Sequence, residues 1–175
     1  MLFILAALTF WLDRASQFNG SEKKPLRHDP DYIVDNFTVK RFDAQGTLYQ
    51  TLQADRMQHY PDDDSTEVEL PRMVYHAERP TFIKADKAWI DSGGKTVQLE
   101  QNVLLIHENI GAPSTQITSS SMTVLPDEEV ARTQVPVTIT QGHSVIHGQG
   151  LDANNKTQIS VMRGRIQGTI APQAK

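Results

Sequence analysis

The chain has 175 residues, of which 38% are hydrophobic and 22% charged, with 10 glycines and 9 prolines. This composition predicts one globular domain and excludes the collagen-like, coiled-coil and fully disordered classes. Seventeen Lys and Arg against 21 Asp and Glu give a net charge of -4, so no basic field is present to hold a nucleic acid. The absence of cysteine excludes disulfides, thiolate nucleophiles and cysteine-ligated metals, and it indicates no particular compartment.

The chain begins with an apolar segment. Residues 1–12 carry no charge, and charged residues follow at once. A helix needs about 20 apolar residues at about 1.5 Å each to cross the hydrocarbon core, so this segment covers about 60% of it. No basic residue precedes it and no small-residue cleavage site follows it, which favours an uncleaved anchor over a cleaved signal peptide. A buried core helix is the alternative. We predict a transmembrane anchor over residues 1–14, whose start is left open, and a polar linker over residues 15–31.

From Tyr32 onward, short runs of Val, Ile, Thr, Leu and aromatic residues alternate with turn-forming clusters. These clusters occupy residues 43–46, 61–64 and 92–94. Within the runs, apolar residues recur at every second position, which gives each strand one apolar face. The pattern predicts an all-β domain over residues 32–170, followed by a tail over residues 171–175.

Four similar units form a weak internal repeat. They start 31, 34 and 31 residues apart, at Ala54, Ala85, Ser119 and Gly150. The strand in the later part of each unit is followed by Pro71, Asn102, Pro136 or Gly164. β units of this length usually stack, each burying its apolar face against its neighbours. The repeat predicts a long two-sheet sandwich, a folded-over sheet or a solenoid, with ordinary strand spacing in an unrelated sandwich as the alternative.

No residue pattern predicts catalysis or a metal site. The six histidines are scattered, and the closest pair, His143 and His147, would lie about 13 Å apart on a strand, too far to share an ion. The acidic runs at 62–64 and 128–129 lie in turns, where carboxylates are usually solvated. The serines at 119–121 lack a nucleophile elbow, and phosphate-binding glycine loops are absent. We predict no enzyme activity, no cofactor and no metal.

Together with the anchor and the repeats, several short stretches resemble the LptC family of inner-membrane lipopolysaccharide-export proteins. They are DPDY at 29–32, FDAQGTL at 42–48, AD at 54–55, HY at 59–60, KADKA at 84–88, the strand at 99–105, TSSSM at 118–122, GQGL at 148–151 and NN at 154–155. The resemblance covers residues 11–168. The chain departs from the family in its shorter anchor, which lacks a basic start, and in its short C-terminal tail. The repeats also resemble those of the soluble partner protein LptA.

The resemblance implies a twisted open β-jellyroll with an apolar groove, held in the periplasm by a single-pass inner-membrane helix. It implies no enzymatic role: lipopolysaccharide leaves the LptB/LptF/LptG ABC transporter, enters the groove and passes to the bridge protein LptA, toward the outer membrane. The N-terminal edge would meet the transporter's jellyroll through Ile33, Phe37 and Val39. The C-terminal edge would meet LptA through Ile159, Val161, Arg163, Ile166 and Ile170.

Strand alternation, with the family's lumen as guide, predicts the residues that line the groove and contact the lipid. They are Phe37, Val39, Leu48, Leu52, Val68, Leu70, Ile83, Val97, Leu99, Val103, Leu105, Val137, Ile139, Ile159 and Val161. For each of them the alternative is a side chain that only closes the core. Two other functions stay open: a carbohydrate-binding or hydrolytic periplasmic β-solenoid, and a membrane-anchored scaffold that does not bind lipid.

Overall fold

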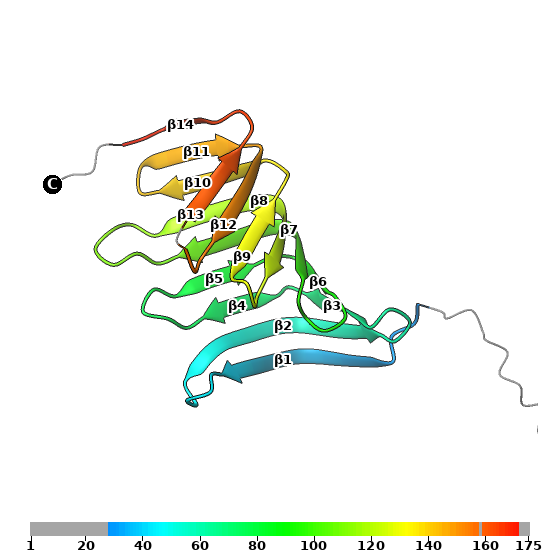
Figure 1. Cartoon of the computed structure of the whole chain (residues 1–175). Helices are drawn as coiled ribbons and strands as arrows, with labels where there is room; N and C mark the ends of the chain where they lie inside the picture. The colour runs from blue at the N-terminus through cyan, green and yellow to red at the C-terminus, as the bar shows by residue number, and fades with distance from the viewer. Residues whose placement is uncertain (1–27, 158, 172–175) are drawn as a thin grey trace, which may run out of the picture.

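The computed structural model describes residues 28–157 and 159–171 (Figure 1). The predicted anchor, most of the predicted linker and residues 172–175 lie outside this part of the chain. Within it, all regular structure is β, as predicted, and the strands form a 14-stranded antiparallel sheet whose first strand begins at Tyr32. None of the described residues belongs to a helix long and apolar enough to cross a membrane.

The strands follow one another closely along the chain. Their bounds are β1 (Tyr32–Phe42), β2 (Leu48–Tyr60), β3 (Ser65–Glu69), β4 (Arg72–Tyr75), β5 (Thr81–Lys84), β6 (Lys87–Ile90), β7 (Val97–His107), β8 (Thr115–Leu125), β9 (Val130–Thr133), β10 (Val137–Gln141), β11 (Ser144–Gly148), β12 (Gly150–Asn154), β13 (Ile159–Arg163) and β14 (Gln167–Thr169).

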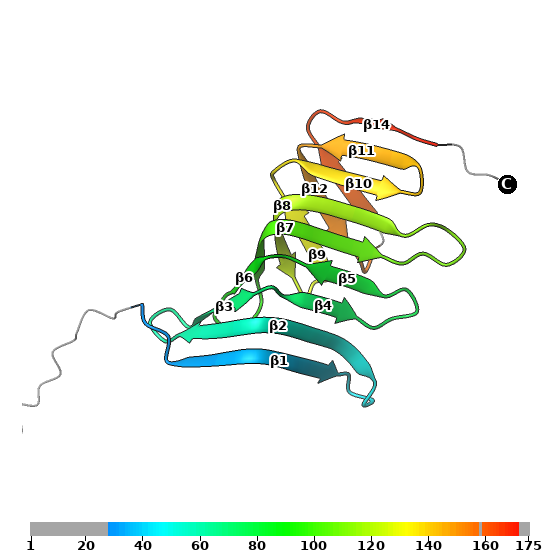
Figure 2. The same ribbon diagram turned by 180° about the vertical axis from the view of Figure 1, so that it is seen from behind.

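Long strands that change partners divide the sheet into two arms. β2 pairs with β4 through its first half and with β3 through its second half. β7 pairs first with β6 and then with β5, and β8 pairs first with β10 and then with β9. We call arm 1 the part made of β3, β6, β9, β12, β13 and the adjoining halves of β2, β7 and β8. Arm 2 is the part made of β4, β5, β10, β11, β14, the other halves of β2, β7 and β8, and the half of β1 that pairs with the first half of β2. Figures 1 and 2 show the folded sheet from opposite sides, with β9, β12 and β13 in front in Figure 1 and β5, β10 and β11 in front in Figure 2.

The predicted repeat follows from this folding. Each unit starts where the chain passes from arm 2 to arm 1, in β2, after β5, in β8 and at the start of β12. Each return to arm 2 lies near Pro71, Asn102, Pro136 or Gly164, the residues that follow the later strand of each unit. At these return corners the backbone turns sharply, and Leu70, Gln101, Asn102 and Gly164 adopt positive φ angles between 50° and 74°. The architecture is therefore a folded-over sheet.

Hydrogen bonds join neighbouring corners to one another. The backbone of Asp86 donates to Gln101 O at 3.0 Å and accepts from Leu70 N at 2.8 Å. Its carboxylate accepts a hydrogen bond of 2.6 Å from Asn102 Nδ2. These contacts satisfy polar groups that the corner takes out of the strand ladder. Asp86, in one of the Ala-Asp stretches of the sequence, thus links the corner at Leu70 to the corner at Gln101 and Asn102.

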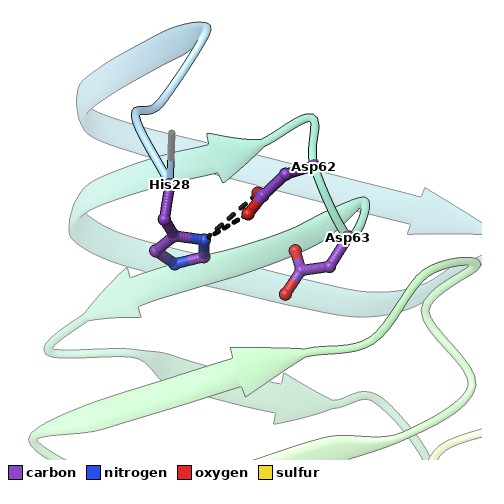
Figure 3. A group of neighbouring side chains, drawn as sticks. All are labelled: His28, Asp62 and Asp63. Atoms are coloured by element: carbon purple, nitrogen blue, oxygen red, sulfur yellow. Dashed lines mark hydrogen bonds and ion pairs between the residues drawn. The ribbon is translucent and has the colours of Figure 1, made fainter. Parts of the chain in front are cut away.

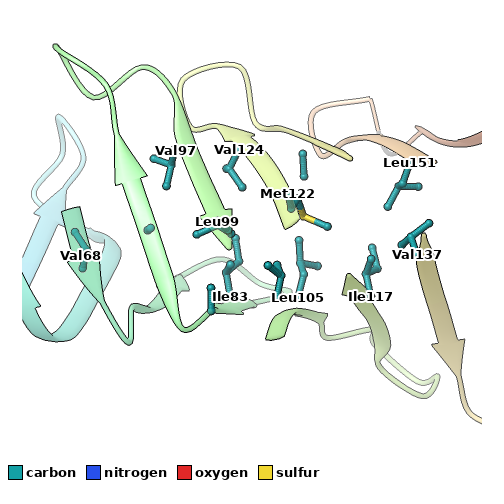
Figure 4. Close-up of a cluster of buried hydrophobic side chains, with 14 of the residues drawn as sticks. Val68, Ile83, Val97, Leu99, Leu105, Ile117, Met122, Val124, Val137 and Leu151 are labelled. Atoms are coloured by element: carbon teal, nitrogen blue, oxygen red, sulfur yellow. The ribbon is translucent and has the colours of Figure 1, made fainter. Parts of the chain in front are cut away.

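The core lies between the two arms. Figure 4 shows side chains of the two arms pointing toward one another, among them Leu99 and Met122 from arm 1 and Leu105 and Ile117 from arm 2. The most deeply buried large side chains are Val68, Val103, Met122, Val137 and Leu151. Burial of such side chains contributes about 1.5–3 kcal/mol each to folding. The core therefore extends along the crossing strands from β3 to β12.

Candidate functional site

An apolar groove runs between the arms. Eleven residues line it, and none of them carries a charge or a polar side chain: Leu52, Val68, Pro71, Met73, Ile83, Ala88, Ile90, Val97, Leu99, Val124 and Pro126. The free volume between these side chains is only ≈ 20 Å³, about the space that one water molecule requires. An acyl chain therefore requires the arms to move apart.

The inner face of arm 2 is lined by a continuous set of facing residues, which we call the apolar row. Strand register places its members directly opposite one another across eight strands: Val39, Leu52, Met73, Ile83, Leu105, Ile117, Ile139 and Ile146. Directly opposite residues point to the same face of a sheet. The row thus extends the groove from β1 to β11, nearly the whole length of the domain.

Most of the residues predicted for the groove point between the arms. Five of them line the groove itself: Leu52, Val68, Ile83, Val97 and Leu99. Five more belong to the core or pack against it: Phe37, Val103, Leu105, Val137 and Ile139. Leu48 is half-buried at the start of β2. Val39 is 50% exposed although it belongs to the apolar row, because β1 is the terminal strand and nothing in the described part of the chain covers it.

Three predicted groove residues do not point inward. Leu70 occupies a corner with positive φ and is exposed. On β13, Val161 faces Asp152 on the outer surface, whereas the adjacent Met162 packs against the core. Ile159 shares the outer face with Val161, and both are more than half exposed. The prediction was wrong here because an alternating strand has two faces, and the sequence of β13 does not indicate which of them is covered.

Sequence reasoning also missed inward-facing residues of β8. Ile117, Met122 and Val124 are buried in the core, but they flank a run of serines and do not alternate regularly. The reason is the corner in β8, where Ser119 Oγ lies 3.1 Å from Ser121 O and 3.1 Å from Pro136 O and can donate its proton to either carbonyl. Before these serines the odd-numbered residues of β8 point inward, as Ile117 does, and after them the even-numbered residues do, as Met122 and Val124 do. The irregular alternation was the only signal available.

Exposed apolar residues gather at the two ends of the sheet. Within the described residues, β1 pairs only with β2, β13 only with β12 and β14 only with β11. Of the twelve exposed large hydrophobic residues, five lie on β1 and four at the C-terminal end: Tyr32, Ile33, Val34, Val39, Phe42, Ile159, Val161, Ile166 and Ile170. Edge strands that have a neighbour on one side only and carry apolar side chains can add a strand from another chain.

One group of possible metal ligands lies outside the groove. His28, Asp62 and Asp63 place one ligand atom each within 4.8 Å of one another (Figure 3). His28 Nδ1 already hydrogen-bonds to the Asp62 carboxylate at 3.0 and 3.1 Å, and this contact raises the pKa of His28. Asp63 accepts a hydrogen bond from Ser65 N at 3.0 Å, and hydrogen bonds from Ser65 lower the pKa of Asp63. The contact between His28 and Asp62 links the segment that precedes β1 to the turn after β2.

A second histidine, His59 of β2, also contacts the segment that precedes β1. His59 Nδ1 lies 2.8 Å from Asp31 Oδ1, and Nε2 lies 3.0 Å from Asp64 Oδ1. Both hydrogen bonds raise the pKa of His59. Tyr32 stacks on the imidazole with ring centroids 4.7 Å apart. The start of β1 is therefore fastened to the end of β2 by polar and aromatic contacts.

Comparisons with known proteins agree with the fold. The chain matches the family described as lipopolysaccharide-assembly, LptC-related, over residues 1–171. A similar solved structure is that of LptH, the LptA-homologous periplasmic component of the conserved lipopolysaccharide transport device from Pseudomonas aeruginosa, with a TM-score of 0.58. It has 12% sequence identity, and the alignment covers 70% of this chain and 95% of that one, so the likeness concerns the fold. No curated protein matches the chain in sequence.

Proposed function

Because this chain belongs to the LptC-related family of lipopolysaccharide-assembly proteins, we propose that it acts in lipopolysaccharide transport as a non-enzymatic conduit. It receives lipopolysaccharide from the inner-membrane LptB/LptF/LptG transporter in the groove between its arms. It then passes the lipid to the periplasmic bridge protein LptA, toward the outer membrane. The observation that carries this proposal is the apolar groove, whose lining includes no polar side chain.

The physical need for such a groove follows from the chemistry of the lipid. Each methylene group exposed to water costs about 0.8 kcal/mol, so an acyl chain cannot cross an aqueous compartment unsheltered. The apolar row offers a sheltered surface from β1 to β11. In this proposal the predicted groove residues that point inward contact the acyl chains, and the transporter's ATP supplies the energy.

The two unpaired ends of the sheet support the partner assignments. In the proposal β1 adds to the jellyroll of a transporter subunit through Ile33, Phe37 and Val39, and the C-terminal end meets LptA. Ile159, Val161, Arg163, Ile166 and Ile170 lie on or beside β13 and β14, and all are exposed. Strand addition at both ends would join the grooves of neighbouring proteins into one continuous trough.

We further propose that the protein is a single-pass inner-membrane protein with its β domain in the periplasm. Residues 1–14 would form the anchor and residues 15–31 the linker. The contacts of His28 and Asp31 with β2 and its turn indicate that the last residues of this linker already belong to the folded domain.

Photocrosslinking tests the proposal. A crosslinking amino acid at Leu52 or Met73, both in the groove lining, should capture lipopolysaccharide in cells. The matched control is Phe82, which neighbours groove residue Ile83 on β5 but is exposed on the other face. Equal capture at Phe82 and Leu52 would contradict a lipid-binding groove. Loss of capture with retained binding of LptA would favour the scaffold alternative.

A further inference from the structure

A second set of facing residues, which we call the polar row, runs beside the apolar row. It lies closer to the strand ends farthest from the corners, which we call the free edge of arm 2. Register places its members directly opposite one another: Arg41, Gln50, Tyr75, Thr81, His107, Thr115, Gln141 and Ser144. Each lies two positions from a member of the apolar row on the same strand, so both rows share the inner face. Every member has a side chain that can form hydrogen bonds.

Two atoms of the polar row have no partner. The Tyr75 hydroxyl and His107 Nε2 are buried and make no hydrogen bond, although His107 Nδ1 lies 2.9 Å from Thr81 Oγ1. Burial raises the pKa of Tyr75 to about 12, so its phenol keeps its proton at neutral pH. Buried polar atoms without partners destabilise a fold, and native structures rarely retain them without a reason.

The inner face of arm 1 carries no matching polar set across the middle of the groove. The residues that lie directly opposite one another across β6, β7, β8, β9 and β12 of arm 1 are Ile90, Val97, Val124, Ala131 and Ala153. The two inner faces of the groove therefore differ: one is apolar across its middle, and the other changes from apolar to polar toward its free edge. Such a gradient matches a molecule that is apolar at one end and rich in hydrogen-bonding groups at the other.

We propose that the polar row of arm 2 binds the sugar headgroup of the transported lipid where it joins the acyl chains, with Tyr75 and His107 as positioning residues. This inference rests on the proposed function. The acyl chains lie along the apolar row, and the headgroup emerges at the free edge of arm 2. The lipid then supplies the hydrogen-bond partners that the protein does not offer to the Tyr75 hydroxyl and His107 Nε2. The polar row orients the lipid, so it enters with its headgroup outward and does not rotate as it moves along the sheet.

The test compares the full chain with the variants Tyr75→Phe and His107→Asn. Asparagine can replace Nδ1 toward Thr81 but does not reach the place of Nε2, whereas His107→Gln reaches it. The probes are purified lipopolysaccharide and diphenylhexatriene, a hydrocarbon without hydrogen-bonding groups. We expect Tyr75→Phe and His107→Asn each to weaken lipopolysaccharide binding about threefold to tenfold. Binding of diphenylhexatriene and the melting temperature should not fall, and His107→Gln should restore affinity.

The matched control is Tyr60→Phe. The Tyr60 hydroxyl lies outside the groove and donates to Glu67 Oε2 at 3.3 Å, so its loss should lower the melting temperature and leave lipopolysaccharide binding unchanged. Wild-type lipopolysaccharide affinity in both polar-row variants would overturn the inference while leaving the proposed function intact. An equal loss of lipopolysaccharide binding and diphenylhexatriene binding, together with a lower melting temperature, would also overturn the inference, because Tyr75 and His107 would then be structural residues. Failure of the wild-type chain to bind lipopolysaccharide would instead refute the proposed function.

Discussion

Arg41 of β1 forms an ion pair with Asp127 in the turn between β8 and β9, and its Nη2 lies 3.9 Å from the carboxylate Oδ1. The contact joins the free edge of arm 2 to the free edge of arm 1 across the mouth of the groove. Tyr49 and Tyr75 make an edge-to-face contact with ring centroids 5.8 Å apart, and both lie close enough to Arg41 and Asp127 for these charges to influence their pKa values. Both charged side chains are well exposed, so the pair contributes at most about 1 kcal/mol and does not prevent opening.

Holding this mouth closed should block lipid entry. The chain has no cysteine, so the double variant Arg41→Cys with Asp127→Cys can be joined selectively by a short bismaleimide. We expect the crosslinked protein to lose lipopolysaccharide uptake and to melt at a higher temperature, because the narrow groove can no longer widen. Each single-cysteine variant, treated with the same reagent, is the control. Unchanged uptake by the crosslinked protein would show that the lipid enters without separation of these edges.

A charge on the inner face should destroy the groove. Val103 is 1% exposed and Leu99 3%, so Val103→Asp or Leu99→Asp buries a carboxylate without a partner. We expect each to reduce the free energy of unfolding by more than about 3 kcal/mol or to prevent folding. Phe82→Asp on the outer face should cost about 1 kcal/mol or less. Denaturant unfolding measures the three values, and normal folding with normal lipid capture by both inner variants would refute the inward assignment.

The entry contacts should respond to pH. Hydrogen bonds to carboxylates raise the pKa of His28 and His59 above their ordinary value of 6.5. A raised pKa in the folded state means that the stabilisation is fully present below about pH 6.5 and is lost as the pH rises through the folded-state pKa. NMR titration should therefore give both imidazoles pKa values above 6.5. The protection factor of the Asp31 amide, whose N–H donates to His59 O, should fall between neutral and mildly alkaline pH, after the intrinsic pH dependence of amide exchange is taken into account.

Two variants separate these histidines. Asp62→Asn should lower the pKa of His28 and leave that of His59 unchanged, because Asp62 hydrogen-bonds to His28. Asp31→Asn should lower the pKa of His59 and leave that of His28 unchanged, although Asp64 remains a second partner of His59. Ordinary pKa values for both histidines in the unsubstituted protein would show that these contacts are not populated in solution.

The C-terminal end offers a test of partner binding. Ile166 is exposed and immediately precedes β14, so Ile166→Pro removes one backbone N–H without disturbing a buried side chain. We expect the melting temperature to change little while binding of LptA in a pull-down falls strongly. Retained binding at unchanged stability would show that this end is not the docking surface. An equal loss of stability and binding would place Ile166 in the fold itself.

The sequence by itself determined the all-β class of fold, and it left a two-sheet sandwich, a folded-over sheet and a solenoid open. Alternation and turn residues are local properties, so they revealed a succession of short strands and the recurrence of similar units. Only the tertiary structure decided that the chain folds over near Pro71, Asn102, Pro136 and Gly164. The family resemblance added the groove and its proposed cargo, and the match over residues 1–171 confirms the family.

Only the tertiary structure decided which face of each strand is covered. Val161 and Met162 are both apolar, yet the second packs on the core and the first faces Asp152 outside. The polar row could not be predicted either, because Tyr75 and His107 become near neighbours only through the pairing of β4, β5 and β7. The physical reason is that alternation acts within one strand, whereas a face or a row arises from the register between strands far apart in the chain.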